Sequence, residues 1–186
     1  MTISSTVNGV DLARLNGTIE AVTADPGLGR FQFRARNHWI DGGHSRTMVQ
    51  GFYGAGQEDT TRTQPFVLDS DEPPVLLGEN LAPNAGEYAL QALAACLTGT
   101  IVYHAAARGI ALRGLECTVQ GDLDVRGFLG LDSDVRPGYE QIQVTIKVAG
   151  ELNDDQLAEI ASLTRYSPVR DVVTNPVAVA IDVARA

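Results

Sequence analysis

Short runs of alternating apolar and polar residues occupy the first 53 residues of the chain. Three such runs place their apolar side chains on one face, as a half-buried strand does: residues 18–22, 31–34 and 47–50. Turn-forming residues at 25–27 (Asp-Pro-Gly) and 41–43 (Asp-Gly-Gly) separate the runs. The pattern predicts an antiparallel meander. The single tryptophan, Trp39, precedes the second turn, and we expect it to pack against the sheet rather than to line a pocket.

Residues 54–83 form a long connection that is rich in glycine, proline and acidic residues. Connections of this length inside a compact domain are often functional. The apolar residues at 65–68 also allow one strand within it.

A long apolar helix is predicted after this connection. Asn84 is a suitable N-cap, and Glu87 three residues later completes the pattern of a capping box. The helix is expected to run to about Arg108 and to end at Gly109. Its middle is rich in alanine and almost uncharged, and a helix that is apolar on every side is expected to be buried.

The last third of the chain combines strands with a second helix. Residues 115–125 and 139–149 alternate as two strands of a hairpin with a long tip. Asn153 begins an amphipathic helix that reaches about Arg165, and residues 176–183 are predicted to close the chain as a strand. Together the elements indicate an α+β protein with a single domain, residues 1–186.

Composition and charge restrict the possible partners. The chain has a formal net charge of −9, which repels nucleic acid and anionic lipid surfaces. We see no apolar run that approaches a membrane span and no signal peptide at the start, so we expect a cytoplasmic protein. The two cysteines are therefore expected to be reduced thiols.

Cys96, at the centre of the apolar helix, is the main candidate for chemistry. It shares a helix face with Thr100 and Tyr103. Two interpretations remain open from the residues alone. A free cysteine in a helix is often a small core hydrophobe. A nucleophilic cysteine needs a cation or several hydrogen-bond donors nearby, and no sequence neighbour supplies one.

Other candidate chemistry is weaker. His104 lies two turns beyond Cys96, roughly 12 Å along the helix axis, which is too far for a general base. His38 and His44 complete a set of three scattered histidines without metal-binding spacing, and no phosphate-binding glycine motif is present. We predict neither a metal nor a nucleotide cofactor.

Several motifs resemble the OsmC/Ohr family. The segment 83–87, Pro-Asn-Ala-Gly-Glu, leads into the apolar helix that carries the motif Leu93-Ala-Ala-Cys96, with Ala85 where the family often has proline. Further matching segments follow in the family's order: residues 107–110, 119–122, 167–169 and 175–177. The resemblance implies an OsmC-like fold, with antiparallel sheets around a long buried central helix, and an intertwined homodimer with active sites at its interface.

The resemblance also implies roles for particular residues. Cys96 corresponds to the cysteine that attacks organic hydroperoxides, and Glu87 to the helix-start glutamate that assists it, although capping alone also explains Glu87. The resolving cysteine of the family is replaced by Ser167, so an external thiol is expected to regenerate Cys96. Cys117 is a possible substitute, but its strand pattern points it into the core.

The family's activating arginine has no obvious counterpart before the helix. Arg46 and Arg62 are candidates from the strand-rich half, and each is also readable as a surface charge. We therefore expect thiol-dependent reduction of organic hydroperoxides at Cys96, in protection against oxidative stress. The alternative is a catalytically inactive protein that keeps the fold for small-molecule binding or a structural role.

Overall fold

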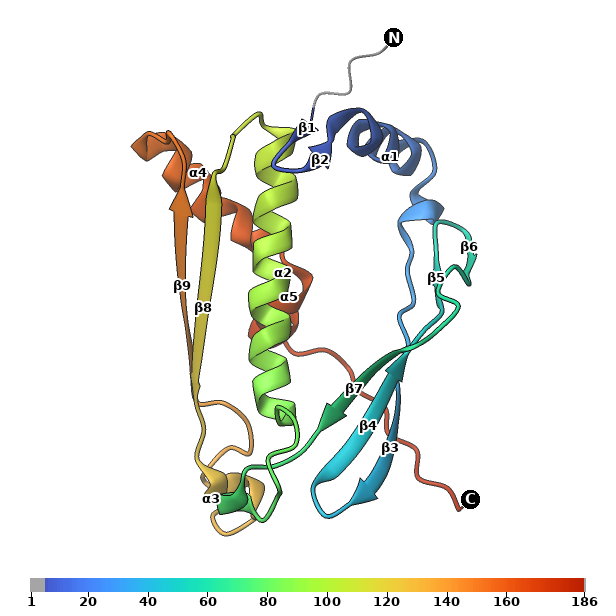
Figure 1. The fold of residues 1–186 in the computed structure, drawn as a ribbon, viewed down its shortest axis with the longest axis vertical. Helices are drawn as coiled ribbons and strands as arrows, with labels where there is room; N and C mark the ends of the chain where they lie inside the picture. The colour runs from blue at the N-terminus through green and yellow to red at the C-terminus, as the bar shows by residue number, and fades with distance from the viewer. Residues whose placement is uncertain (1–5, 186) are drawn as a thin grey trace. The chain divides into compact units, whose positions relative to one another are not determined.

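The computed structural model describes residues 6–185, which fall into two compact units (Figure 1). Unit 1 contains residues 11–89, and unit 2 contains residues 6–10 and 90–185. The boundary between them lies within the long helix α2 (Ala85–Ala107). A two-residue ladder of β1 (Thr6–Val7) and β2 (Val10–Asp11) precedes the main elements.

Unit 1 is built on a three-stranded antiparallel sheet in the order β3-β4-β7. Its strands are β3 (Arg36–Asp41), β4 (His44–Val49) and β7 (Phe66–Ser70), and the turn predicted at 41–43 joins the first two. The predicted strands at 47–50 and 65–68 correspond to parts of β4 and β7. Trp39 on β3 is 74% exposed, and its indole N–H donates to the carbonyl of Gly42 at 3.1 Å. The ring therefore braces the turn instead of packing into a core.

The other elements of unit 1 differ from the predicted meander. The segment 18–22 lies in helix α1 (Leu12–Ala24), which Asp11 caps through hydrogen bonds from the backbone N–H groups of Ala13 and Arg14. Helical spacing of Leu12, Leu15, Ile19 and Val22 outweighs the local alternation. The segment 31–34 forms only an isolated bridge, at Gln32.

The connection 54–83 holds several short elements. These are part of the hairpin of β5 (Phe52–Gly54) and β6 (Gln57–Asp59), strand β7, and the 3₁₀ turn η2 (Pro74–Leu76). Another 3₁₀ turn, η1 (Pro26–Gly29), lies earlier in the chain, directly after α1. Asp71 is 2% exposed and accepts hydrogen bonds from the backbone N–H groups of Glu72, Glu79 and Leu81 at 2.8–3.1 Å. One buried carboxylate thus closes the loop that leads to α2.

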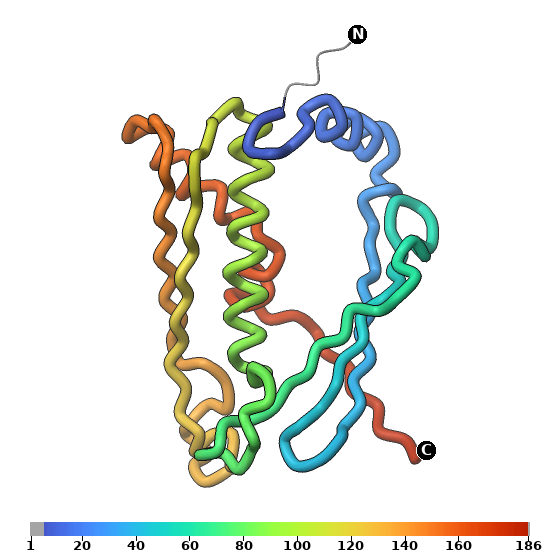
Figure 2. Tube along the Cα trace, viewed as in Figure 1, coloured from blue at the N-terminus to red at the C-terminus, as the bar shows by residue number. Residues whose placement is uncertain are grey.

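Unit 2 packs a hairpin and the second amphipathic helix against α2, as Figure 2 shows. The hairpin consists of β8 (Gly114–Asp122) and β9 (Gln141–Ala149), with a short helix α3 (Val125–Phe128) in its long tip. Helix α4 (Asp154–Leu163) begins with a capping box of Asn153 and Gln156. The turn η3 (Thr164–Tyr166) connects it to helix α5 (Pro168–Thr174).

The closing strand predicted at 176–183 does not form. These residues have no strand partner among the described residues, and their apolar side chains are exposed, with Val183 94% exposed. A strand requires a neighbouring strand for its backbone hydrogen bonds, which alternation alone cannot supply.

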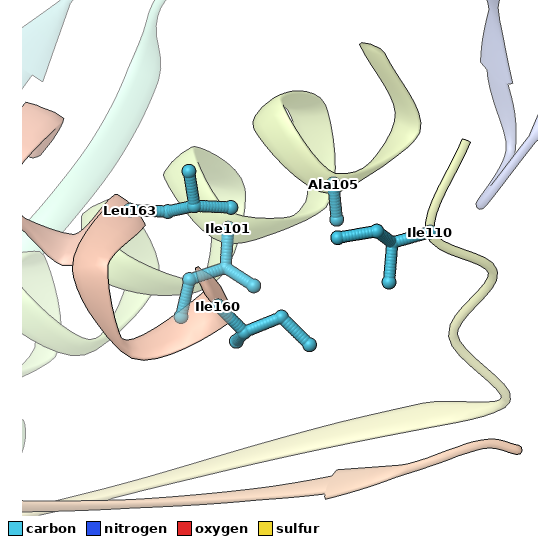
Figure 3. Packing of buried hydrophobic residues seen from close by; sticks show 5 residues of the cluster. All are labelled: Ile101, Ala105, Ile110, Ile160 and Leu163. Atoms are coloured by element: carbon cyan, nitrogen blue, oxygen red, sulfur yellow. The ribbon is translucent and has the colours of Figure 1, made fainter. Parts of the chain in front are cut away.

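The core of unit 2 lies between α2 and α4. Ile101 and Ala105 of α2 pack with Ile110, Ile160 and Leu163, as Figure 3 shows. Leu93 and Leu97 extend the buried stripe toward the start of α2. Burial of such a stripe at ~25 cal/mol per Å² is the main force that holds the helix in place.

Only one side of α2 is buried in the single chain. The expectation of a helix buried on every side is therefore too strong, and residues such as Tyr103 are more than half exposed. The expectation that no apolar run approaches a membrane span is also wrong. Within residues 6–185, α2 is the one helix long and apolar enough to cross a membrane by length and composition, a criterion that core helices of soluble proteins also meet.

Candidate functional site

Cys96 and Ser167 form the centre of the candidate site. The Ser167 hydroxyl donates a hydrogen bond to the Cys96 sulfur, with an Oγ–Sγ distance of 3.1 Å. Helix α2 provides the cysteine, and the serine comes from the residue that begins α5. Ser167 is only 1% exposed, while Cys96 is half-buried. Ser167 thus contacts the sulfur, although a hydroxyl cannot form a disulfide with it.

The local sequence explains why the serine hydroxyl points at the sulfur. Ser167 is the N-cap of α5, Pro168 occupies the first helical position, and the Arg170 backbone N–H donates to Ser167 Oγ at 3.2 Å. This bond occupies an acceptor site of the hydroxyl and leaves its proton for Cys96. The serine is thus the hydrogen-bond donor and the Cys96 sulfur the acceptor.

A ring stack lies next to Ser167 along the chain. The His104 imidazole and the Tyr166 ring are 4.6 Å apart between centroids and tilted by 12°. Burial first, and then the charges of Arg108 and Arg165, lower the pKa of His104, so the imidazole is neutral at pH 7. A hydrogen bond from Arg165 lowers the pKa of Tyr166. No hydrogen bond joins His104 to Cys96.

Glu87 forms the predicted capping box at the start of α2. Its backbone N–H donates to Asn84 Oδ1, and its carboxylate accepts from the Asn84 backbone N–H, both at 2.9 Å. Glu87 precedes Cys96 by nine residues, about 13 Å along the axis of an ideal helix. The capping role is therefore present in the structure.

The two arginine candidates are engaged within unit 1. Arg46 forms a two-pronged ion pair with Asp69, at 2.6 and 2.9 Å. Arg62 donates to the carbonyl of Gln50 and stacks over the rings of Phe52 and Phe66. Each guanidinium has a structural role that requires no thiolate.

Cys117 lies on β8 opposite Ile146 of β9, on the inward face with Leu115 and Val119. Burial raises the pKa of the Cys117 thiol, which leaves less thiolate at neutral pH. Both cysteines are free thiols. Within residues 6–185, no three His, Cys, Asp or Glu side chains are grouped so that they could hold a metal ion.

Sequence reasoning proposed Cys96 as a candidate but did not predict helix α5, whose N-cap Ser167 contacts the Cys96 sulfur. The Ser-Pro pair at 167–168 is a helix-start signal, and it was interpreted only as a changed resolving motif. The Ser167–Cys96 hydrogen bond joins residues 71 positions apart, so no local pattern predicts it.

Comparison with known proteins identifies the family. The profile described as OsmC-like protein matches residues 78–182, more than half of the chain and the whole of α2. No curated protein matches the chain at a significant level.

Three solved structures share the fold. An OsmC-like protein from Mycoplasma pneumoniae has a TM-score of 0.60 at 14% identity, over 78% of this chain and 89% of its own. A protein from Psychrobacter arcticus has a TM-score of 0.57 at 14% identity, over 76% and 88%. A Legionella pneumophila protein described as organic hydroperoxide resistance protein OsmC has a TM-score of 0.54 at 19% identity, over 76% and 88%.

The family match spans α2, which makes this helix the core helix of a soluble fold. The capping box before α2, the cysteine at its centre and the fold of unit 2 agree with that match. The chain belongs to the OsmC-like protein family.

Proposed function

We propose that the protein reduces organic hydroperoxides at Cys96, in protection against oxidative stress in the cytoplasm. Membership of the OsmC-like family supports this proposal, as does the description of the Legionella structure as an organic hydroperoxide resistance protein. The observation that carries it is the hydrogen bond from the buried Ser167 hydroxyl to the Cys96 sulfur.

The reaction begins with the Cys96 thiolate. Its sulfur attacks the outer oxygen of the hydroperoxide, an S–O bond forms as the O–O bond breaks, and the leaving alkoxide takes up a proton to give an alcohol. Cys96 becomes a sulfenic acid. An external thiol condenses with it to a mixed disulfide and water, and a second external thiol then releases the disulfide and restores Cys96.

Ser167 makes the external reductant necessary. A cysteine at this position would form an internal disulfide, whereas a hydroxyl can only donate a hydrogen bond to the sulfur. Ser167 is therefore proposed as a positioning residue that holds the attacking sulfur through its hydrogen bond. We further propose that Glu87 assists catalysis in addition to capping α2, and that its carboxylate faces the peroxide in the assembled protein.

The assembled protein is proposed to be a homodimer. One side of α2 remains uncovered in the single chain, and the apolar residues Val177, Val179 and Ile181 alternate along an exposed segment without a strand partner. A second copy can cover the helix and pair with the segment. Light scattering is expected to give twice the chain mass of 19.8 kDa; a mass near 19.8 kDa would contradict the dimer.

Turnover with cumene hydroperoxide and excess dithiothreitol tests the proposed reaction. We expect wild type to consume peroxide and Cys96→Ser to lose all thiol-dependent consumption. Ser167→Ala is expected to slow the reaction about tenfold or more, since a hydrogen bond to a charged group contributes about 1.5–3 kcal/mol. Retained turnover in folded Cys96→Ser would contradict the proposal.

The alternative function is small-molecule binding without turnover. Two observations favour it: the resolving thiol is absent, and the arginine candidate Arg46 is occupied by Asp69. A Cys96 thiol that reacts with hydroperoxide no faster than free cysteine would support this alternative.

A further inference from the structure

Unit 2 contains an open cleft of about 960 Å³ between α2, β9, α4 and α5. Alternate residues of β9 form its floor and therefore point to one side of the strand: Ile142, Val144, Ile146 and Val148. At ~3.4 Å per residue this apolar floor is about 20 Å long. Cys96 does not line the cleft.

The walls of the cleft are apolar, and its two ends differ. Its lining includes Leu93 and Leu97 of α2 and Leu157 and Ile160 of α4. At the end nearest the hairpin base, the lining merges with the core cluster around Ile101. One end is thus closed by packed aliphatic side chains.

The opposite end carries the polar groups. Arg136, Tyr139, Glu140 and Gln141 lie just before or at the start of β9, and α5 adds Arg170. The lining is therefore aliphatic along its length and polar at the tip end of the hairpin.

Two arginine side chains in this lining are available to a ligand. Across residues 6–185, neither the Arg136 nor the Arg170 guanidinium has an ion-pair or hydrogen-bond partner; Arg170 uses only backbone atoms in its contacts with Ser167 and Thr174. Glu140 is the one carboxylate in the described lining. The cleft therefore carries a net positive charge in a chain with a formal net charge of −9.

We propose that this cleft binds a single-chain amphiphile with an anionic head group, namely an alkyl carboxylate of medium or long chain. The alkyl chain lies along the β9 floor, and the carboxylate faces Arg136 and Arg170. A membrane-lipid tail spans half of a ~30 Å hydrocarbon core, about 15 Å, which fits within the floor. The volume lies in the range of small-molecule sites, roughly 300–1,000 Å³.

This binding site is separate from the proposed peroxide chemistry. Its residues come from α2, the segment before β9, β9 itself, α4, Thr164 of η3 and α5, and Cys96 is not among them. No covalent step is involved. Dodecanoate should therefore bind to Cys96→Ser as tightly as to wild type.

Titration calorimetry with dodecanoate below its micelle concentration tests the site. We expect saturable binding of one molecule per chain. The double variant Arg136→Gln/Arg170→Gln should bind about tenfold more weakly or worse, because charge-assisted hydrogen bonds are lost. Arg14→Gln/Arg30→Gln is the matched control. Both arginines lie in unit 1, neither guanidinium has an ion-pair or hydrogen-bond partner among residues 6–185, and the two double variants remove the same total charge.

Two further measurements test the carboxylate contact and the alkyl-chain contact separately. Dodecanol, which lacks the charge, should bind wild type and the cleft double variant with equal affinity. Val144→Trp places a large ring over the floor at a partly exposed position and should abolish binding of both compounds while circular dichroism stays unchanged. The proposal is overturned if wild type shows no saturable binding, if the cleft and control arginine variants bind dodecanoate alike, or if folded Val144→Trp still binds it.

Discussion

Replacing Ser167 with cysteine would place a second sulfur beside Cys96. The two side-chain atoms are now 3.1 Å apart, and a disulfide needs about 2.05 Å, so a closure of ~1 Å is required. Rotation about the side-chain bonds of the two residues can provide this movement. We expect Ser167→Cys to form an internal disulfide with Cys96 on mild oxidation.

The expected stabilisation follows from the length of the closed loop. The two residues are 71 positions apart, and chain-entropy arguments give about 4 kcal/mol for a loop of this size. Strain around the buried position reduces that figure, since a larger atom in a packed site typically costs about 1–3 kcal/mol. The oxidised variant should therefore unfold at higher denaturant concentration than the same protein after reduction, by a net difference of roughly 1–3 kcal/mol.

Intact mass and denaturant titration provide the assay. Oxidised Ser167→Cys should lose two hydrogens in mass and have no thiol at Cys96 available to iodoacetamide. One equivalent of hydroperoxide should produce this state without an external thiol. Ser162→Cys, on the exposed face of α4, adds the same thiol away from Cys96 and should form no internal disulfide. If Ser167→Cys also stays reduced, the proximity of the two side chains is refuted.

Three further substitutions test other parts of the structure. Hydrogen bonds from the backbone N–H groups of Leu81, Glu72 and Glu79 lower the pKa of Asp71, so its stabilising effect is complete above pH ~4 and is lost as pH falls through the lowered pKa. Asp71→Asn should flatten the acid side of the stability profile, and an unchanged acid-unfolding curve would contradict this role. Glu87→Gln retains the cap but removes the charge, so unchanged helix content with slower peroxide turnover supports the proposed catalytic role, and unchanged turnover leaves capping as its only role. Cys117→Ser should leave turnover intact because burial raises the pKa of that thiol, and loss of turnover in folded protein would reinstate Cys117 as a participant.

Capping signals and long hydrophobic patterns predicted much of the fold. The Asn84–Glu87 box, the Gly109 end of the helix and the β8–β9 hairpin all follow from local rules. Helix α1 was not predicted, because the alternation of apolar and polar residues at 18–22 indicates a strand. The helical spacing of apolar residues that begins at Leu12 was not taken into account. Period assignments over so few residues are ambiguous.

Contacts between residues far apart in the sequence could not be predicted at the candidate site. Cys96 was identified from its helix, but the group that contacts its sulfur comes from Ser167, in a separate helix. The segment 176–183 shows the same limit, since its alternation is typical of a strand while the partner strand is missing from the described residues. A local sequence pattern indicates that a strand or a side chain needs a hydrogen-bond partner. Which residue supplies that partner depends on the tertiary structure.

Trapping of a sulfenic acid shows directly whether Cys96 reacts with hydroperoxides. Wild type and Cys96→Ser would be exposed briefly to cumene hydroperoxide with a dimedone-type trap, and each adduct located by mass spectrometry. We expect an adduct at Cys96 that forms faster than on free cysteine, and none on Cys117 in the variant. A Cys96 that remains an unmodified thiol, or an adduct distributed equally over both cysteines, would contradict this expectation.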